Sequence, residues 1–436
     1  MDKNEALFDF ARQYLVGGVN AGVRVCKAFG NRPFYVSRGE GSRVYDLEGR
    51  EYIDMCTSHG ASFLGHKHPR IVAALQLAAE LGILCSYETE FHSALAKKIV
   101  DMVPCAERVR FSGSGSETTM HTIRLAREYT GRDKILKFTG HFHGYYDYMM
   151  FTPYAPAATA IATPAGLYPE SGGIPAGMDG HVIIVPDNDL GALERTMRGH
   201  KDEIAGIIME PVHYNAGCIV PRAEYVRQVE DLAHRNGSLL IFDEVLSGFR
   251  MGPGGAQEYL GVIPDLCILG KAVGGGLPLS AICGRHEVME HLRPLGAAQH
   301  SGTYNAGLVC ILAGLAALEE YSSPGFYDRV NATGQHLYRG IAEIIQRLGV
   351  KARVQGLGAR FGIYFGIDSE VTRFEQSLQN DMEMTERFIT VAWQNGVYFH
   401  DYGGRGAHHH GFSAAHTVSD MDRALEGIED AFKAVR

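Results

Sequence analysis

Between about residue 69 and residue 300, short apolar runs alternate with stretches whose apolar positions recur at helical spacing. Short, continuously apolar runs are typical of strands that are buried on both faces of a parallel sheet. The pattern predicts seven such strands, at 109–111, 134–138, 182–185, 204–209, 238–245, 266–269 and 280–283. With helices between them, these strands predict an α/β fold with a mostly parallel, doubly wound sheet.

The two ends of the chain follow other patterns. Before residue 57, a short amphipathic helix precedes alternating runs between glycine-bearing turns, which predicts a small antiparallel meander. After residue 305, one long apolar helix over 306–321 leads into helices and strand-like runs in an α+β pattern. The stretch 152–180 is rich in Pro, Ala, Thr and Gly, and it suits either a binding loop or lid or a surface loop without a role.

The composition excludes several classes of protein. The chain has 436 residues and a net charge of −9 without a basic stripe, which argues against a nucleic-acid partner. Its eight cysteines are scattered without a Cys-x-x-Cys spacing, so we expect reduced thiols and a cytoplasmic location. The acidic N-terminus lacks a signal core, and no apolar stretch approaches the roughly 20 residues that span a bilayer. We therefore expect a soluble protein without a membrane partner.

An aspartate and a lysine follow two neighbouring predicted strands. Asp243 ends the apolar run 238–245, and Lys271 follows the run 266–269 in a glycine-rich segment. A buried acid and a lysine placed in this way suit pyridoxal phosphate, because the lysine can form a Schiff base while the acid keeps the ring nitrogen protonated. A structural ion pair between adjacent strands would use the same two residues.

A second candidate site begins where the first of the seven strands ends. Ser112-Gly113-Ser114-Gly115-Ser116-Glu117 leads into a predicted helix, so hydroxyls, backbone N–H groups and a helix N-terminus meet there. An ordinary N-cap would explain part of this pattern. Two glycines alternating with three serines exceed what a cap requires, and the segment therefore favours phosphate binding.

Further candidates follow other strands of the set. Phe142 comes after the strand 134–138 and could stack on a planar cofactor with His143 as a polar support, although such an aromatic residue is usually part of the core. Glu210 and Asn215 follow the strand 204–209. All of these positions fall at the carboxyl edge of the sheet, where open α/β folds bind ligands, and this convergence favours the cofactor interpretation of Asp243 and Lys271.

Three weaker candidates remain open from the residues alone. Thr303 could donate a hydroxyl to phosphate or merely cap the helix that follows. Arg24 could bind a substrate carboxylate in bidentate fashion or be an ordinary solvated arginine. The run His408-His409-His410 suggests a metal, but adjacent histidines on a strand point to alternate faces and no acid or cysteine cluster lies near, so we expect no metal.

Together these motifs resemble class III (fold type I) pyridoxal-phosphate aminotransferases. Within them the chain is similar to the branch that contains glutamate-1-semialdehyde 2,1-aminomutase and D-phenylglycine aminotransferase. The segments that carry the resemblance are 17–20, 46–49, 64–69, 114–117, 130–135, 142–144, 243–250, 270–271 and 301–303. The resemblance implies a large domain over 58–320 and a small α+β domain built from both termini, 1–57 and 321–436.

The resemblance also implies roles for individual residues. Lys271 would be the Schiff-base lysine and proton shuttle, Asp243 would pair with the ring nitrogen, and Thr303 would come from the partner subunit of a homodimer with its active sites at the interface. Cofactor contacts are implied for Ser114, Gly115, Ser116, Phe142, His143, Glu210, Asn215, Asp243, Val245, Lys271 and Thr303. Substrate contacts are predicted for Arg24, Ser58, His59 and Arg405.

The segments 20–24, 58–61 and 303–307 depart from the aminomutase pattern, whereas 58–61, 113–119 and 403–406 are closer to the D-phenylglycine enzyme. We therefore predict a pyridoxal-phosphate-dependent aminotransferase that acts on a carboxylate-bearing α- or β-amino acid and an oxo acid. An intramolecular aminomutase, with 152–180 retaining the intermediate, is one alternative. An ammonia- or phospho-lyase on the same scaffold is the other.

Overall fold

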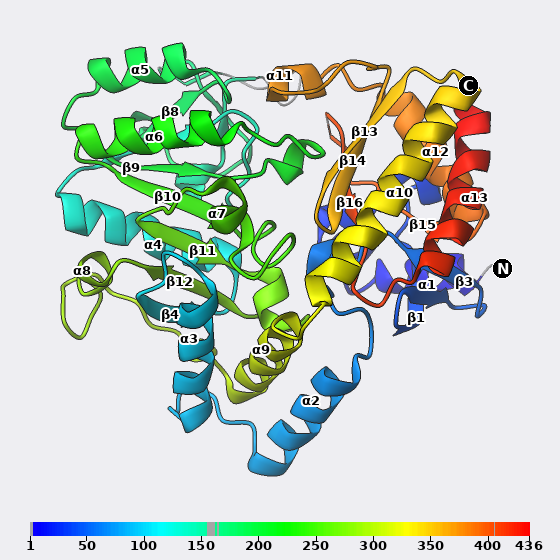
Figure 1. Cartoon of the computed structure of the whole chain (residues 1–436), viewed down its shortest axis with the longest axis horizontal. Helices are drawn as coiled ribbons and strands as arrows, with labels where there is room; N and C mark the ends of the chain where they lie inside the picture. The colour runs from blue at the N-terminus through cyan, green and yellow to red at the C-terminus, as the bar shows by residue number, and fades with distance from the viewer. Residues whose placement is uncertain (1–2, 155–161, 164, 405) are drawn as a thin grey trace.

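A computed structural model describes residues 3–154, 162–163, 165–404 and 406–436. Its centre is a seven-stranded sheet in the order β4-β12-β11-β10-β9-β5-β8 (Figure 1). The strands are β4 (Arg108–Ser112), β5 (Lys134–Phe138), β8 (Val182–Val185), β9 (Ile204–Met209), β10 (Leu239–Glu244), β11 (Leu266–Leu269) and β12 (Ser280–Gly284). Only β12 runs antiparallel to its neighbours. All seven predicted strands are therefore confirmed.

Helices cover both faces of this sheet, as a doubly wound fold requires. On one face, apolar side chains of the strands pack against α5 (Leu190–Gly199), α6 (Ala223–Arg235) and α7 (Gly255–Leu260). On the other face they pack against α4 (Gly115–Thr130) and α8 (His286–Met289). Every residue of β9 and β10 is buried, which explains why these strands are continuously apolar up to the acidic end of β10.

The core continues through helices that flank the sheet on one side. These are α2 (Pro69–Leu81), α3 (Glu90–Met102) and α9 (Leu308–Tyr321). Helix α9 begins two residues later than the predicted helix at 306–321, and α2 begins at Pro69, a residue suited to the first turn of a helix. Figure 1 shows α2 and α9 side by side beneath the central sheet.

Segments from both ends of the chain share a second region (Figure 1). The strands β1 (Val36–Glu40), β2 (Arg43–Asp46) and β3 (Glu51–Asp54) form an antiparallel meander, and β15 (Val397–Tyr398) adds to β3 in parallel. A three-stranded sheet consists of β13 (Ala352–Leu357), β14 (Arg360–Phe365) and β16 (His409–Gly411). Helices of this region are α1 (Lys3–Ala11), α10 (Phe326–Leu348), α11 (Phe374–Ser377), α12 (Met382–Gln394) and α13 (Val418–Val435). The domain boundaries at 57 and 320 stay a prediction.

Short elements complete the described part of the chain. Within 152–180 the structure places β7 (Tyr168–Pro169), which pairs with β6 (Phe151–Thr152), while 155–161 and 164 lie outside the described residues. The eight cysteines are free thiols, as expected. Across the described ranges, no helix combines the length and the apolar character that crossing a membrane would need.

Candidate active site

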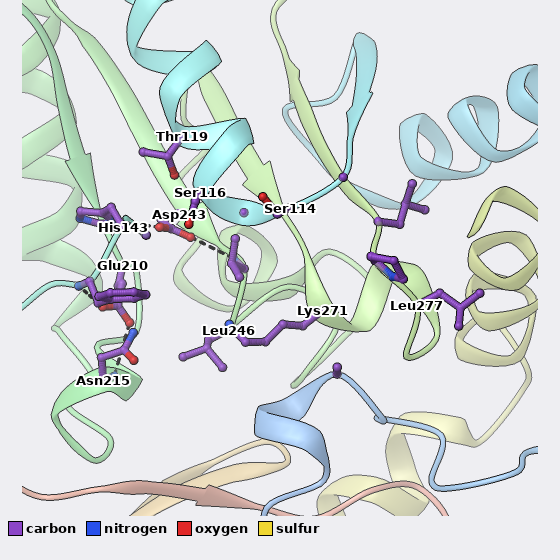
Figure 2. Close-up of a pocket in the computed structure, with 18 of the residues that line it drawn as sticks. Ser114, Ser116, Thr119, His143, Glu210, Asn215, Asp243, Leu246, Lys271 and Leu277 are labelled. Atoms are coloured by element: carbon purple, nitrogen blue, oxygen red, sulfur yellow. Dashed lines mark hydrogen bonds and ion pairs between the residues drawn. The ribbon is translucent and has the colours of Figure 1, made fainter. Parts of the chain in front are cut away.

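A pocket of about 460 Å³ opens at the carboxyl ends of the central strands. Its volume lies within the range of small-molecule sites. The pocket is lined by ten of the predicted cofactor residues: Ser114, Gly115, Ser116, Phe142, His143, Glu210, Asn215, Asp243, Val245 and Lys271. They come from the segments that follow β4, β5, β9 and β11 and from the end of β10 (Figure 2). The predicted convergence at one sheet edge is thus present in the structure.

Asp243 is buried at the end of β10, and its carboxylate accepts two hydrogen bonds. His143 Nδ1 donates to Asp243 Oδ2 at 2.7 Å, and the backbone N–H of Val245 donates to Oδ1 at 3.1 Å (Figure 2). The His143 ring is itself buried, and its Nε2 has no hydrogen-bond partner among the described residues. This arrangement fixes a carboxylate in the pocket wall, where it can hold a proton on a cationic ring nitrogen.

Lys271 begins η8 (Lys271–Gly274), directly after β11, and lines the same pocket. Its backbone has a φ of +46°, a left-handed conformation that is uncommon for a side-chain-bearing residue and typical of functional sites. Burial lowers the pKa of Lys271 to about 8, with Asp243 opposing this shift and the charges of Arg250 and Arg360 adding to it. A larger fraction of its amine is therefore neutral and nucleophilic near neutral pH.

The first turn of α4 forms an anion cradle. Ser114 is the N-cap, and its hydroxyl accepts from the N–H of Glu117 at 3.3 Å. Ser116 Oγ accepts from the N–H of Tyr145 at 3.1 Å. Gly144 has a φ of +85° and lies close to Ser116. A Cβ added to Gly144 would be 2.5 Å from Ser116 Oγ. Backbone N–H groups, hydroxyls and the positive end of a long helix suit a phosphate.

Two apolar side chains and one buried acid complete the pocket. Phe142 and Val245 both line it, so a planar ring can be accommodated against apolar walls. Glu210 Oε1 accepts from the N–H of Phe142 at 2.9 Å, and Glu210 is buried. The N–H of Asn215 lies 3.5 Å from Glu210 Oε2. Glu210 therefore ties two segments of the pocket wall together.

The structure does not bring every predicted residue into this pocket. Thr303 is exposed and lines a separate pocket of about 500 Å³, and its carbonyl accepts from Ser86 Oγ at 3.1 Å. Arg24, in η2 (Gly22–Arg24), and Ser58 are exposed. Arg405 lies outside the described residues. The roles given to these four residues stay predictions.

His59 is presented by a strained turn. Thr57, Ser58 and His59 have φ values of 51°, 54° and 55°, and Gly60 follows at 88°. Asp54 Oδ1 accepts from the N–H of Thr57 at 2.9 Å and braces the start of this turn. His59 Nδ1 lies 2.9 Å from the hydroxyl of Tyr402, and burial lowers the pKa of His59 to about 3.

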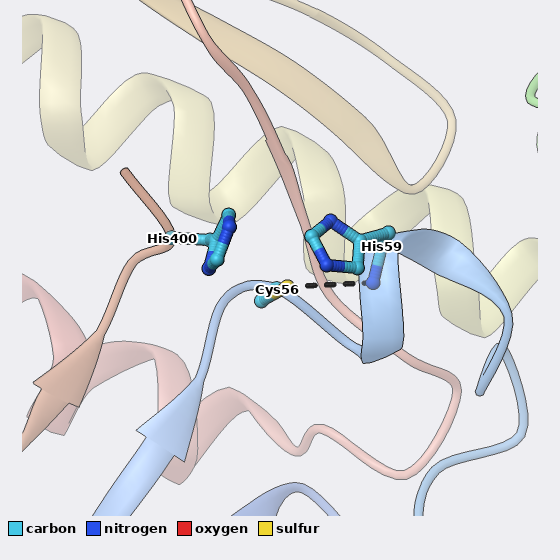
Figure 3. Close-up of side chains that lie close together, drawn as sticks. All are labelled: Cys56, His59 and His400. Carbon is cyan, nitrogen blue, oxygen red and sulfur yellow. Dashed lines mark hydrogen bonds between the residues drawn. The ribbon is translucent and has the colours of Figure 1, made fainter. Parts of the chain in front are cut away.

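Cys56, His59 and His400 lie close together beside this turn (Figure 3). His400 Nε2 lies 3.0 Å from the carbonyl of Val23, and its Nδ1 lies 3.0 Å from the hydroxyl of Tyr398. Burial lowers the pKa of His400 to about 4. Because both ring nitrogens of His400 are engaged, we describe this group as neutral hydrogen-bonding histidines and not as a metal site.

A second pocket of about 260 Å³ adjoins the first and shares Phe142 and Asn215 with it. Its lining adds Lys137, Glu170, Phe374, Tyr402, His408 and His409. The sequence leaves open whether the run 408–410 lines a pocket, and the structure places His408 and His409 in this lining. The available signal is the run of three histidines directly after the glycine-rich stretch 403–407.

Comparisons with known proteins agree on one family. The profile of the family described as "Aminotransferase class-III" matches residues 26–432. The chain is 40% identical to a glutamate-1-semialdehyde 2,1-aminomutase of Methanocaldococcus jannaschii, over 100% of this chain and 99% of that protein. An omega-transaminase structure from Sphaerobacter thermophilus is 31% identical and superposes with a TM-score of 0.90, over 100% of this chain and 98% of that chain. A transaminase structure with PLP bound is 26% identical, with a TM-score of 0.88 over 99% and 97% of the two chains.

Proposed function

The chain belongs to the class-III aminotransferase family, and on this premise we propose that it moves an amino group between a carboxylate-bearing amino acid and an oxo acid. Its cofactor is pyridoxal phosphate. The observation that carries the proposal is one pocket in which Lys271, the Asp243–His143 pair and the anion cradle of α4 meet. This donor set fits the lysine, ring-nitrogen and phosphate contacts that the cofactor requires.

When bound, the cofactor supplies a carbonyl carbon that takes up the amino group and a ring that accepts electrons from the substrate. Ser114, Gly115 and Ser116 would hold its phosphate through hydroxyl and N–H donors. Phe142 and Val245 would pack against the two faces of its ring. Thr303 of a second copy of the chain would add a hydroxyl to the phosphate, in keeping with its exposure on this one.

The residues around the reacting atoms have separate tasks. The carboxylate of Asp243 would keep a proton on the ring nitrogen, and the hydrogen bonds from His143 and from the N–H of Val245 hold this carboxylate in place. Lys271 Nζ is neutral for a larger fraction of the time than the amine of an ordinary lysine. It would remove the proton from the substrate carbon that bears the amine and return it to the cofactor carbon that takes up the amino group. The burial of Asp243 limits the access of water to this part of the pocket.

An intramolecular aminomutase is the second candidate. It is favoured by the full-length relative of that name at 40% identity. Both activities would use Lys271 and Asp243 in the same way. An aminotransferase moves the amino group from one molecule to another, whereas an aminomutase moves it to another carbon of the same molecule. The surroundings of the substrate, and not the cofactor side of the pocket, would decide between them.

Acceptor dependence tests the proposal. Purified enzyme loaded with pyridoxal phosphate is given a panel of α- and β-amino acids, and glutamate 1-semialdehyde, with and without an oxo acid. We expect amino acid consumption to continue only when an oxo acid is present. Sustained isomerisation of glutamate 1-semialdehyde without an oxo acid would establish the mutase instead. Sustained release of ammonia or phosphate would establish a lyase.

A further inference from the structure

Two arginine side chains are buried beside the active site without a carboxylate partner. Arg250 is 1% exposed and Arg360 is 0% exposed. Among the residues that the structure describes, neither guanidinium forms an ion pair with an acid. A Cβ on Gly60 would lie 3.2 Å from Arg250 Nη2 and 3.3 Å from Arg360 Nη1, so both groups flank the same glycine. Two positive charges therefore sit close together in the interior.

The hydrogen bonds of these arginines lead only to neutral acceptors. Arg250 donates to the carbonyls of Leu246, at 3.1 Å, and Gly60. Arg360 Nη1 lies 3.3 Å from the carbonyl of Cys56, and its Nε is buried without a partner among the described residues. Burying charge without a counter-charge costs several kcal/mol per ion in typical cases. A nearby anion would offset this cost.

Arg360 also fixes the position of the ring proton on a histidine that lines the adjoining pocket. Arg360 Nη2 donates to His409 Nδ1, and because arginine can only donate, the ring proton of neutral His409 must be on Nε2. Burial, reinforced by the charge of Arg360, holds the pKa of His409 well below its usual value. His409 lines the pocket of about 260 Å³ that adjoins the cofactor pocket. It therefore offers an uncharged N–H donor backed by a cation.

The other charged groups of that pocket do not supply the missing counter-charge. Lys137 Nζ donates to the carbonyls of Met149, at 2.7 Å, and Phe151, at 3.4 Å. Glu170 lines the same pocket, and burial raises the pKa of its carboxyl group. One lysine and one glutamate balance each other, which leaves the positive charges of Arg250 and Arg360 uncompensated.

We propose that His409, positioned by Arg360, binds the carboxylate of the substrate through its Nε2–H. Arg250 and Arg360 then act as the buried charges that favour an anion over a neutral group of the same shape. The inference rests on the proposed function and specifies where its carboxylate-bearing substrate is recognised. It assigns to His409 the role that the sequence suggests for Arg24 or Arg405.

A structural role is the competing explanation for the arginines. Both donate to the strained turn that presents His59, through the carbonyls of Cys56 and Gly60. Bracing alone would make the turn rigid but would not make the pocket prefer an anion. A binding measurement that compares a charged with an uncharged ligand therefore separates the two roles.

The test uses glutarate and its uncharged diamide, glutaramide, as probes with the holoenzyme, followed by isothermal titration calorimetry. We expect the wild-type enzyme to bind glutarate at least about 10-fold more tightly than glutaramide. His409→Leu should weaken glutarate binding roughly 10- to 100-fold, as expected for loss of a hydrogen bond to a charged group. His409→Gln keeps a donor near the position of Nε2 and should weaken binding by no more than about 3-fold.

Two further variants complete the set. Arg360→Met should reduce the preference for glutarate, because it removes one of the two buried charges and the donor that keeps the ring proton of His409 on Nε2. The matched control is His410→Gln, since His410 neighbours His409 on β16 but packs against Phe361 and Phe399, and it should bind glutarate as the wild type does. Thermal unfolding of each variant verifies that it is folded, and the preference of the wild type between the two probes keeps the test valid if His409→Leu or Arg360→Met does not fold.

Several results would overturn the inference. The first is equal affinity of the wild type for glutarate and glutaramide. The second is unchanged glutarate binding in His409→Leu. The third is loss of glutarate binding in Arg24→Gln while His409→Leu still binds glutarate as the wild type does. The visible absorbance of the bound cofactor is recorded on the same samples. Its absence from the wild type would contradict the proposed function, whereas the preference between the two probes would still test the anion site by itself.

Discussion

The two sides of the active site handle charge in opposite ways. On the cofactor side, the buried acid Asp243 has a hydrogen-bonding partner in His143, and the anion cradle consists of hydroxyls and N–H groups at the start of α4. On the proposed substrate side, Arg250 and Arg360 are buried, neither forms an ion pair with an acid among the described residues, and Arg360 donates to His409, which burial keeps neutral. The acid of the cofactor side thus has its hydrogen-bond donors within the chain, whereas the two arginines of the proposed substrate side have no acid partner among the described residues.

This difference shows which parts of the site are fixed and which set specificity. The groups that hold a permanent cofactor need their geometry before it binds, so they are hydrogen-bonded to each other. The groups that select a transient anion can remain uncompensated, because their electrostatic cost is recovered only when the correct ligand binds. The predictions that follow test each side of this comparison.

The largest effect is expected from Lys271→Ala, on the cofactor side. It removes the amine that binds the cofactor covalently and moves the proton, and turnover should fall roughly 1,000-fold or more. The fold should persist, because the change removes a partly desolvated amine. Steady-state kinetics and the visible cofactor spectrum measure both effects, with Lys134→Ala as the control, because Lys134 is a half-buried lysine at the start of β5 that pairs with Glu203. Turnover at the wild-type rate would show that Lys271 is not the reacting amine.

Asp243→Asn should lower kcat roughly 100- to 10,000-fold while changing KM much less, because the amide cannot keep the ring nitrogen protonated. His143→Gln weakens only the hydrogen bond that holds the carboxylate, and it should cost roughly 10- to 100-fold. The order of these two effects is the informative result. A larger loss in His143→Gln than in Asp243→Asn would mean that the histidine, and not the acid, faces the cofactor.

Acidification should destabilise the protein through the histidines of the substrate side. The pKa values of His59 and His400 are lowered to about 3 and about 4, below the value near 6.5 of an unfolded histidine. Between those limits the unfolded chain binds more protons, so the free energy of unfolding falls as pH decreases from 7 to 5. Each such histidine contributes up to about 1.4 kcal/mol per pH unit. Thermal unfolding should show a shallower dependence in His59→Asn, and a Tm that stays constant over this range would contradict the burial of neutral histidines.

Gly144→Ala should have the smallest effect of the set, on the cofactor side. Its φ of +85° disfavours any side chain, and the new Cβ would lie 2.5 Å from Ser116 Oγ. We expect a loss of about 1–3 kcal/mol in stability and faster loss of the cofactor. Gly131→Ala is a matched control, because Gly131 has a φ of +68° but no atom within 4 Å of the added Cβ. Equal cofactor retention in the two variants would show that the approach of Gly144 to Ser116 does not shape the cradle.

The cofactor side could be predicted from the sequence because each of its residues follows a recognisable strand. An apolar run marks β10 or β11, and the polar residue that ends or follows it must lie at the carboxyl edge of the sheet. The substrate side has no such local signal. Arg360 contacts Cys56 across 304 positions of sequence, and His59 contacts Tyr402 across 343. Which partners meet there depends on how both ends of the chain fold together, and a short motif does not encode this.

The exposure of a side chain could not be predicted from the sequence either. Arg24 was a reasonable carboxylate ligand by residue type, but the structure leaves it exposed in η2, while the buried Arg250 ends the motif 243–250 without a predicted role and the buried Arg360 comes from a segment without a recognisable motif. The local pattern identifies residue types that suit a function. Burial, which decides whether a charge acts strongly, follows only from tertiary packing.

One measurement tests the central claim most directly, namely that Lys271 is the cofactor lysine opposite Asp243. The holoenzyme is reduced with borohydride to make the covalent attachment permanent, digested, and analysed by peptide mass spectrometry. The account predicts one labelled peptide, with the mass of the reduced cofactor on Lys271. Labelling of Lys137, the other buried lysine beside the pocket, or the absence of any label on Lys271 in a fully loaded enzyme would contradict it.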